Sequence, residues 1–418
     1  MEFVNDSVRK IKADNGREAK LWVRHPELIE DLALSQIKSM LESPRLFEHI
    51  AVMPDVHFGK GASIGAVMAL DEAVVPNCVG VDIGCGMAAY PTGLAYEGER
   101  ASREYWRNWL GNAQRGIPTG FSCHNGHPKT LEHLRLLSSA ERGEQASPAN
   151  IRCKGHIRAA KKFNDLDEMA LRQTGTMGGG NHFLEVQRDS AGQVWLMVHS
   201  GSRHIGYQIA DHYAKVARAY NEAEGLESAH MLHWLPLSEQ AGQDYLHDMQ
   251  WAVDYALLNR KVMLRSALSS LNLEFDESMM INIPHNYAAK ENHFGKDVVV
   301  HRKGATSAKT GELGIIPGSM GTPSYIVKGL GNPQSYSSCS HGAGRAMGRK
   351  HAKRVLSTSD FSESLSGTFS KASAGYLDEA PQAYKNIDLV VGAQDELVSV
   401  VHKLEPVITL KDGQGGVD

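Results

Sequence analysis

The sequence predicts a globular fold that mixes β-strands with α-helices. Short apolar runs rich in Val and Ile, as at 194–198 and 279–283, favour buried strands, whereas hydrophobic residues recur at helical spacing over 27–43, 204–224 and 238–270. With 418 residues the chain exceeds the usual span of one hydrophobic core, so length alone favours two domains. The hydrophobic share of 42% is ordinary for a soluble protein, and no apolar run reaches the roughly 20 residues that a membrane helix needs.

Periodicity places the remaining elements in chain order. Residues 1–25 are expected to form a β-rich lead-in to the helix at 27–43, and a short apolar strand starts at His49. Further strands are expected at 73–81, 183–186 and 407–411, and further helices near 104–113, 130–141 and 386–403. The glycine-rich tail at 413–418 is expected to fray.

Composition limits the ligands and the cellular compartment that the sequence predicts. Because the net charge is −4, bulk electrostatics does not favour a nucleic-acid ligand, and a basic patch would have to be local. Five cysteines, an odd number without a CxxC pair, indicate a reducing compartment. The N-terminus shows no basic segment followed by an apolar one, so we expect a cytoplasmic protein without a signal peptide or membrane contact.

A carboxylate and a thiol stand three residues apart in the segment at 80–87. Asp82 and Cys85 lie between glycines, and Gly84 and Gly86 allow positive φ angles that bring both side chains to one point. Burying two such groups together is unfavourable unless a divalent cation neutralises them. Taken alone, the segment is explained equally well by a glycine turn with a half-buried Asp82 and a small apolar Cys85.

Three histidines favour the interpretation of this segment as part of a metal site. His182, His199 and His285 each stand at the end of a hydrophobic run, although any one of them alone would more often be a core or surface histidine. With Asp82 and Cys85 they offer one oxygen, one sulfur and three nitrogen donors. This set exceeds the needs of one tetrahedral zinc ion and suits two divalent ions bridged by the thiolate.

Several loops suit an anion beside this metal site. The segments at 174–181, 302–308, 315–325 and 337–345 offer small residues, hydroxyls and backbone N–H groups close to Arg or Lys, as phosphate-binding loops do. Small residues surround His341, and its neutral imidazole could attack a phosphorus atom. Asp55, His57 and Lys60 follow the strand that starts at His49 and fit an active-site rim, although a surface loop is the default interpretation.

The segment at 98–175 carries the weakest signal. It contains residues that could form a Cys2His2 zinc clip: Cys123, His124, His127, Cys153 and His156. Their separations match no familiar zinc finger, so a flexible polar insertion is the favoured interpretation.

Eight motifs carry a family resemblance. MPDVHFGKG, GVDIGCGM, GGGNHFLEV, HSGSR, HNYAAKENHFG, RKGATSA, IIPGSMGTPSY and SCSHGAGR together resemble the RtcB family of GTP-dependent RNA ligases, over about residues 20–411. The resemblance implies an α+β fold, with mixed sheets and flanking helices around a deep metal-containing cleft. It also implies one compact domain over 1–418 in place of the two expected from length. The insertion at 115–160 matches no family pattern, and His204 stands where the family usually has glycine.

The activity implied by this resemblance is RNA ligation in RNA repair or tRNA splicing. Members of the family use GTP and manganese, here two Mn²⁺ ions, to join an RNA end with a 2′,3′-cyclic phosphate or 3′-phosphate to a 5′-hydroxyl end. The reaction would pass through a histidine–GMP bond and a 3′-guanylylated RNA. We expect the protein to act as a monomer.

The resemblance also assigns residues by motif. The metal ligands would be Asp82, Cys85, His182, His199 and His285, and the guanylylated residue would be His341. Contacts to the guanylate would come from Asn181, Phe183, Glu185, Asn286, Pro317, Gly318, Ser319, Met320, Ser324, Gly342, Ala343, Gly344 and Lys411, with Asp55 and Tyr384 as second-rank contacts. Arg203 and Arg345 are candidates for binding RNA phosphate, since guanidinium groups recognise phosphate in a bidentate manner.

Two other function classes remain open from the residues. A metal-dependent phosphoesterase could use the same donors to activate water, without a covalent nucleotide and without GTP. A noncatalytic RNA-binding module would need basic and aromatic surfaces, and the aromatic share of 7% and the acidic net charge count against it.

Overall fold

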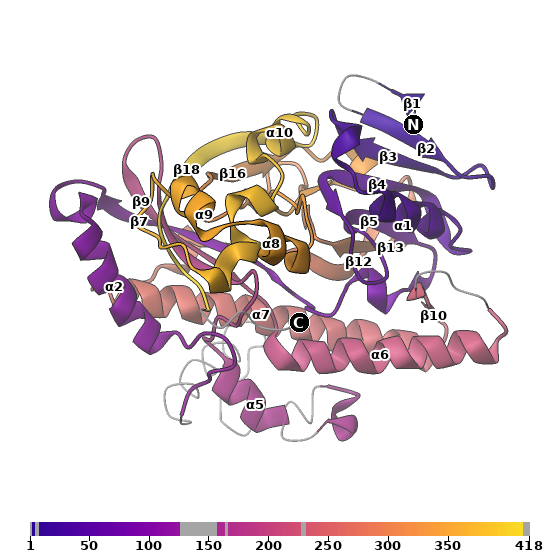
Figure 1. The fold of residues 1–418 in the computed structure, drawn as a ribbon. Helices are drawn as coiled ribbons and strands as arrows, with labels where there is room; N and C mark the ends of the chain where they lie inside the picture. Colours follow the sequence, from indigo (N-terminus) through magenta and orange to yellow (C-terminus); the bar gives the residue numbers. More distant parts are fainter. Residues whose placement is uncertain (1, 5–7, 126–156, 164–165, 227–230, 413–418) are drawn as a thin grey trace.

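The computed structural model describes residues 2–4, 8–125, 157–163, 166–226 and 231–412 (Figure 1). Within these ranges, most strands belong to two seven-stranded sheets. The first sheet has the spatial order β1 (Glu2–Phe3), β2 (Val8–Lys12), β3 (Glu18–Trp22), β4 (Leu46–His57), β5 (Ile64–Leu70), β13 (Lys296–Lys303) and β12 (Asn286–His293). The second has the order β11 (Ile281–Pro284), β7 (Gly86–Ala95), β9 (Gln193–Ser200), β8 (Phe183–Arg188), β18 (Val398–Leu410), β16 (Ser324–Gly329) and β15 (Leu313–Ile316). Two short pairs join β10 (Leu235–Pro236) to β6 (Ala73–Val74) and β14 (Ala305–Ser307) to β17 (Ser338–Ser340).

The helices flank these sheets. They are α1 (Asp31–Leu41), α2 (Arg103–Gly116), α5 (Leu166–Gln173), α6 (Arg203–Ala223), α7 (Gln240–Ser269), α8 (Arg349–Val355), α9 (Thr358–Ser364) and α10 (Ile387–Gly392). The long helices α6 and α7 lie side by side along one side of the molecule (Figure 1), and α7 contacts β7, β9 and β11 of the second sheet as well as β12 of the first. Its side chains Met263 and Leu264 are fully buried against the second sheet, where each contributes about 1.5–3 kcal/mol of hydrophobic stabilisation. The expected α+β fold class is confirmed.

Four neighbouring strands of the second sheet bring their ends to one edge. Because β11, β7, β9 and β8 pair antiparallel, the start of β7 lies opposite the ends of β11 and β9, and Phe183 at the start of β8 lies opposite His199 near the end of β9. Antiparallel pairing therefore gathers four residues that are far apart in the sequence: Cys85, His182, His199 and His285.

The strand expected at 73–81 is wrong in its extent. β6 ends after two residues, and a 3-10 turn follows at Pro76–Cys78, because proline cannot donate to a sheet ladder. Asp82 therefore lies in a loop before β7 and not at the end of a strand. Gly84 has the expected positive φ of 72°, but Gly86 does not. A Cβ atom on Gly86 would lie 2.1 Å from a carbonyl oxygen of β11, so this glycine permits close strand packing.

Two other elements depart from the expectation. The helix expected at 386–403 ends at Gly392, and β18 starts at Val398 and not near 407. The β-branched run at the start of β18 favours a strand, and pairing with β16 and β8 incorporates it into the sheet. The helix expected at 27–43 is shorter, since a 3-10 turn at Pro26–Leu28 precedes α1.

The expected helices near 104–113, 204–224 and 238–270 are confirmed by α2, α6 and α7. The strand that starts near His49 is longer than expected, so Asp55 and His57 are buried within β4 and do not lie in a turn. The helix expected at 130–141, the tail at 413–418 and three zinc-clip candidates, His127, Cys153 and His156, lie outside the described residues. None of the helices in the described ranges has the length and apolar character needed to cross a membrane.

Candidate active site

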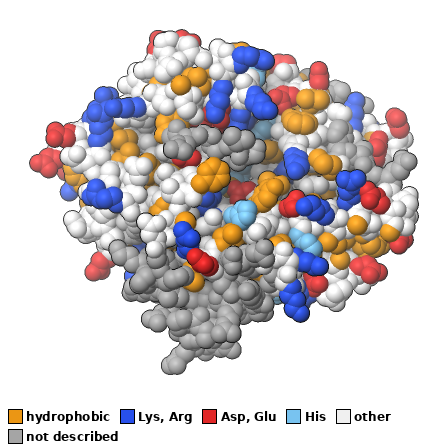
Figure 2. Space-filling model, turned by 60° about the horizontal axis from the view of Figure 1, so that its bottom comes forward, with side chains coloured by type: hydrophobic (Ala, Val, Ile, Leu, Met, Phe, Trp, Pro, Cys, Tyr) orange, Lys and Arg blue, Asp and Glu red, His pale blue; other side chains and the backbone are white. Residues whose placement is uncertain are grey.

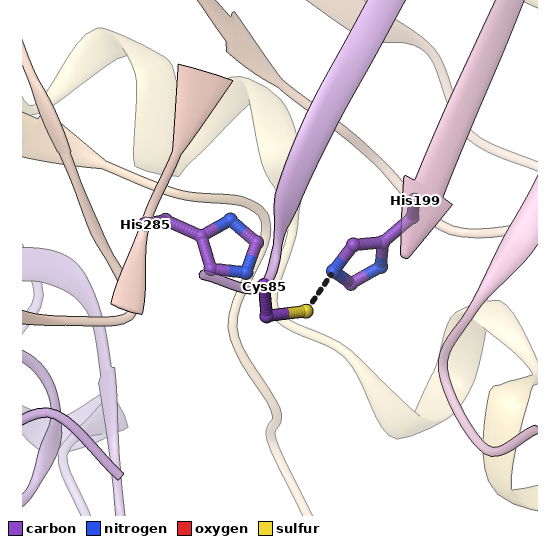
Figure 3. A group of neighbouring side chains, drawn as sticks. All are labelled: Cys85, His199 and His285. Atoms are coloured by element: carbon purple, nitrogen blue, oxygen red, sulfur yellow. Dashed lines mark hydrogen bonds between the residues drawn. The ribbon is translucent and has the colours of Figure 1, made fainter. Parts of the chain in front are cut away.

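Four side chains surround one thiol, that of Cys85. The Cys85 Sγ atom lies 3.3 Å from Nε2 of His199 and 3.4 Å from Nε2 of His182. The latter nitrogen lies 3.0 Å from Oδ2 of Asp82. Cys85 thus belongs to two groups whose potential ligand atoms lie within 4.8 Å of one another, one with His199 and His285 and one with Asp82 and His182. Figure 3 shows the first group, in which the two imidazoles flank Cys85.

Backbone carbonyls orient two of these imidazoles. Nδ1 of His182 lies 3.0 Å from the carbonyl oxygen of Met177, and Nδ1 of His199 lies 3.1 Å from that of Asn181. Because a carbonyl only accepts, each Nδ1 carries a proton. In the neutral ring of His199 the Nε2 lone pair therefore faces Cys85, as in histidines that bind metals, whereas Nε2 of His182 faces both Cys85 and the Asp82 carboxylate. Nδ1 of His285 is buried and has no hydrogen-bond partner among the described residues, which leaves a nitrogen available to a ligand.

Burial makes the cluster suitable for cations. It lowers the pKa of His199 and of His285 well below the usual range, and neighbouring histidines add to this effect. Burial raises the pKa of Cys85, and the Asp82 carboxylate raises it further. Burial also acts to raise the pKa of Asp82, but the hydrogen bond and charge of His182 outweigh it and lower that pKa to about 2. The neutral imidazoles of His199 and His285, a carboxylate and a thiol that ionises beside a cation fit divalent metal ions.

His341 lies beside this cluster on a buried carboxylate. Its Nδ1 atom lies 2.6 Å from Oδ2 of Asp55, and the same oxygen accepts a 3.0 Å hydrogen bond from the His341 backbone N–H. Because the carboxylate accepts, Nδ1 carries the proton and Nε2 retains a free lone pair. The ring centroid of His341 lies 4.8 Å from that of His285. Asp55, expected as a nucleotide contact, is thus placed to orient a nucleophilic nitrogen beside the candidate metal centre.

Gln187, which the sequence did not single out, joins Glu185 and Ser324, two of the expected nucleotide contacts. Glu185 in β8 accepts a 2.6 Å hydrogen bond from Thr409 and a second from Gln187. Gln187 also donates to Ser324 Oγ at 2.9 Å, and that oxygen accepts from the Gly318 backbone N–H at 3.1 Å. Burial raises the pKa of Glu185 to about 7. These bonds connect β8 to the loop between β15 and β16.

The buried carboxylate of Glu379 forms hydrogen bonds with three further candidate ligand-binding residues. Oε2 of Glu379 accepts hydrogen bonds from Lys411 at 2.8 Å and Tyr384 at 2.9 Å, and Oε1 accepts from Arg345 at 2.8 Å. Although burial acts to raise the pKa of Glu379, the charges of Lys411 and Arg345 lower it to about 2. Glu379 could not be singled out from the sequence, because its partners come from separate segments and no local pattern marks it.

The two candidate RNA-binding arginines differ in their contacts. Arg345 donates to Glu379 and to the carbonyl oxygen of Asp378. Arg203 begins α6 with a positive φ of 59°, and it donates to Thr176 Oγ1 and to the carbonyl oxygen of Gly120, both at 3.2 Å. Both arginines therefore have protein partners that an RNA phosphate would have to share or replace.

The remaining candidates lie on adjoining loops. The Ala343 N–H donates to the Pro317 carbonyl at 3.1 Å, so the segments at 317–320 and 342–344 meet. Met320 packs in a separate apolar cluster, which leaves only its backbone for a ligand. Asn286 donates to the Asp82 carbonyl at 3.1 Å and accepts from the Gly304 N–H at 2.8 Å, which joins the metal loop to the β13–β14 turn.

Comparison with known proteins identifies the family. A family model described as tRNA-splicing ligase RtcB matches residues 36–412, which include all five candidate metal ligands and His341. The chain belongs to the RtcB family. It is 37% identical over 413 aligned residues to RNA-splicing ligase RtcB of Escherichia coli (strain K12), covering 94% of this chain and 97% of that protein. It is 30% identical to the tRNA-splicing ligase RtcB of Nanoarchaeum equitans, covering 91% and 92%, and 30% identical to that of Archaeoglobus fulgidus, covering 90% and 88%.

The RtcB resemblance expected from the eight motifs is therefore confirmed. On the face of this RtcB-family chain shown in Figure 2, Lys and Arg side chains are interspersed with acidic and apolar ones. This mixed distribution agrees with the net charge of −4, so an anionic ligand would be bound by individual basic residues.

Proposed function

We propose that this protein is an RNA ligase that joins a 2′,3′-cyclic-phosphate or 3′-phosphate RNA end to a 5′-hydroxyl end, in RNA repair or tRNA splicing. The observation that carries the proposal is the imidazole of His341, whose Nδ1 is bonded to Asp55 and whose Nε2 is free beside a five-donor cluster. A nucleophile oriented by an acceptor is the arrangement that covalent group transfer requires.

His341 would carry the nucleotide. Its Nε2 atom attacks the α-phosphorus of GTP, a P–N bond forms, and pyrophosphate leaves. The Nδ1 proton remains on the hydrogen bond to Asp55, which stabilises the positive charge that develops on the ring. An oxygen of an RNA 3′-phosphate then attacks the same phosphorus and displaces the histidine; a cyclic phosphate is first hydrolysed. Finally the 5′-hydroxyl attacks the activated RNA phosphorus, and GMP leaves with the bonding electrons.

The ligand sites would be divided among the candidate residues. Two Mn²⁺ ions would be bound by the two groups that share Cys85, and these ions supply positive charge that neutralises phosphate oxygens. The guanylate would lie near Glu185 and Lys411, and Arg203 and Arg345 would contact RNA phosphate. A cytoplasmic location is supported by the free thiols of the four described cysteines.

The test is incubation with α-labelled GTP and Mn²⁺, followed by denaturing electrophoresis. We expect a labelled protein band that is stable to alkali and labile to acid, as a phosphoramidate is. His341→Ala should bind Mn²⁺ yet give no labelled band, and it should still seal RNA that already carries a 3′-guanylylated end. Labelling of His341→Ala would mean that another residue is the nucleophile. Hydrolysis of RNA phosphate without GTP, and without any labelled band, would instead support the phosphoesterase.

A further inference from the structure

Two consecutive polar residues of α7 are fully buried behind the candidate metal centre. Asn259 and Arg260 each have 0% exposure, within a helix whose other residues facing the sheets are mostly apolar. Burying an amide and a guanidinium is unfavourable unless their hydrogen-bonding groups find partners. The chemistry proposed above uses neither side chain, so their partners need an explanation.

The guanidinium of Arg260 joins three segments that carry metal ligands. Its Nη1 atom donates to the carbonyl oxygens of Gly84 and Ser200, both at 2.8 Å, and its Nε atom donates to Oδ1 of Asn282, also at 2.8 Å. Gly84 immediately precedes Cys85, Ser200 immediately follows His199, and Asn282 lies on β11 three residues before His285. One side chain therefore fixes the relative position of the backbone beside all members of one ligand group.

Asn259 extends this bonding to the segment of His182. Its Nδ2 atom donates to the carbonyl oxygens of Thr176 and Gly201 at 3.0 and 3.2 Å, and to Ser200 Oγ at 3.0 Å. Its Oδ1 atom accepts from the backbone N–H groups of Gly175 and Thr176 at 2.7 and 3.2 Å. The glycine loop that leads to His182 is thus tied to the end of β9.

The charge of Arg260 is also placed toward the ligands. No carboxylate forms an ion pair with it in the described part of the chain. Burial lowers the pKa of Arg260 to about 10, and the nearby Cys85 and Asp82 oppose this shift.

We infer that Asn259 and Arg260 are positioning residues, which preset the spacing of the metal ligands from a rigid helix. The inference rests on the proposed metal centre. The ligands lie on or beside glycine-containing loops, where Gly84 and Gly175 have φ of 72° and 77°, so the loops alone do not define one geometry. Groups that orient metal ligands typically change metal affinity about 10- to 100-fold when they are removed.

The test is Mn²⁺ binding by isothermal titration to the full chain, measured well below the melting temperature of each metal-free variant. Arg260→Met and Asn259→Leu should weaken Mn²⁺ binding about 10- to 100-fold. Lys261→Met is the matched control, because Lys261 is the next cation on α7 and pairs with Glu277 at 2.5 Å. Its Mn²⁺ affinity should equal that of the wild type.

Unchanged Mn²⁺ affinity in folded Arg260→Met and Asn259→Leu, even with a lowered melting temperature, would overturn the inference and leave the pair a structural role only. If these variants do not fold, Asn282→Ala decides, because it removes one partner of Arg260 and should weaken Mn²⁺ binding by a smaller factor. Equal affinity of Asn282→Ala and wild type would then refute the inference. A wild-type chain that binds no Mn²⁺ would instead overturn the metal centre itself, and the inference with it.

Discussion

Replacing Asp55 by alanine should slow guanylylation of His341 by about two to four orders of magnitude. Oδ2 of Asp55 accepts two hydrogen bonds from His341, at 2.6 Å from Nδ1 and 3.0 Å from the backbone N–H. Hydrogen bonds to charged groups contribute about 1.5–3 kcal/mol each, so the variant loses about 3–6 kcal/mol of interactions that orient the nucleophile. Each loss of about 1.4 kcal/mol in transition-state stabilisation lowers a rate about tenfold, which gives the range if the loss is expressed in the transition state.

Asp55→Asn provides the matched comparison. One oxygen accepts both bonds, so an amide oxygen in its place can still orient His341, although without the charge. The new amide nitrogen would replace Oδ1, which is buried without a partner near the Lys385 ammonium. Asp55→Asn should therefore be slower than wild type but faster than Asp55→Ala.

The assay is the single-turnover rate of protein labelling from α-labelled GTP at saturating Mn²⁺, with Mn²⁺ titration and thermal melting as controls for the cluster and the fold. Labelling of Asp55→Ala at the wild-type rate would refute the proposed orientation. An Asp55→Asn variant slower than Asp55→Ala would refute the argument that one oxygen orients the imidazole.

Three further predictions concern other parts of the site. Cys85→Ala should abolish Mn²⁺-dependent labelling while circular dichroism shows an intact fold, and full labelling would exclude Cys85 as a ligand. Arg203→Ala and Arg345→Ala should form the GMP adduct but transfer it slowly to RNA; loss of the adduct, measured by labelling, would place them at the nucleotide. Because folding lowers the pKa of Glu379 from 4.5 to about 2, its stabilisation of about 3 kcal/mol is full above pH 4.5 and is lost as the pH falls toward 2. Urea unfolding of Glu379→Gln should accordingly depend less on pH in this range, and an unchanged pH dependence would contradict the assignment.

The donors of the candidate metal centre could be predicted from the sequence because each one is marked locally. His182, His199 and His285 border apolar strands, and antiparallel pairing of β11, β7, β9 and β8 gathers such positions at one edge. The structure brings the predicted residues together although the strand expected before Asp82 is wrong in its extent, and their role as metal ligands stays a prediction. Residue types and their positions at strand ends were sufficient to predict this cluster, because the register of strand pairing brings the strand ends together.

The groups that orient the site could not be predicted, since their roles depend on partners distant in the sequence. Asp55 and His341 are 286 positions apart, and Arg260 and Gly84 are 176 apart. The sequence placed Asp55 at an active-site rim, and the family resemblance made it a second-rank nucleotide contact, but neither indicated that it orients His341. Arg260 was not singled out because it lies within the helical pattern of apolar residues in α7. The helix expected at 386–403 was extended too far for a related reason, because the β-structure from Val398 depends on pairing with strands β16 and β8.

The site is assembled from elements of two different sheets. This explains why the metal ligands could be predicted from local sequence while the orientation of His341 could not. The candidate metal ligands belong to the edge of the second sheet, whereas Asp55 belongs to β4 of the first sheet and His341 follows the short strand β17. The His341 loop approaches β4 so closely that a Cβ atom on Gly344 would lie 2.1 Å from the carbonyl oxygen of Asp55. Close approach of this kind requires glycine with its φ of 73°. The distance between His341 and the candidate metal centre therefore depends on how the two sheets pack, which no single motif contains.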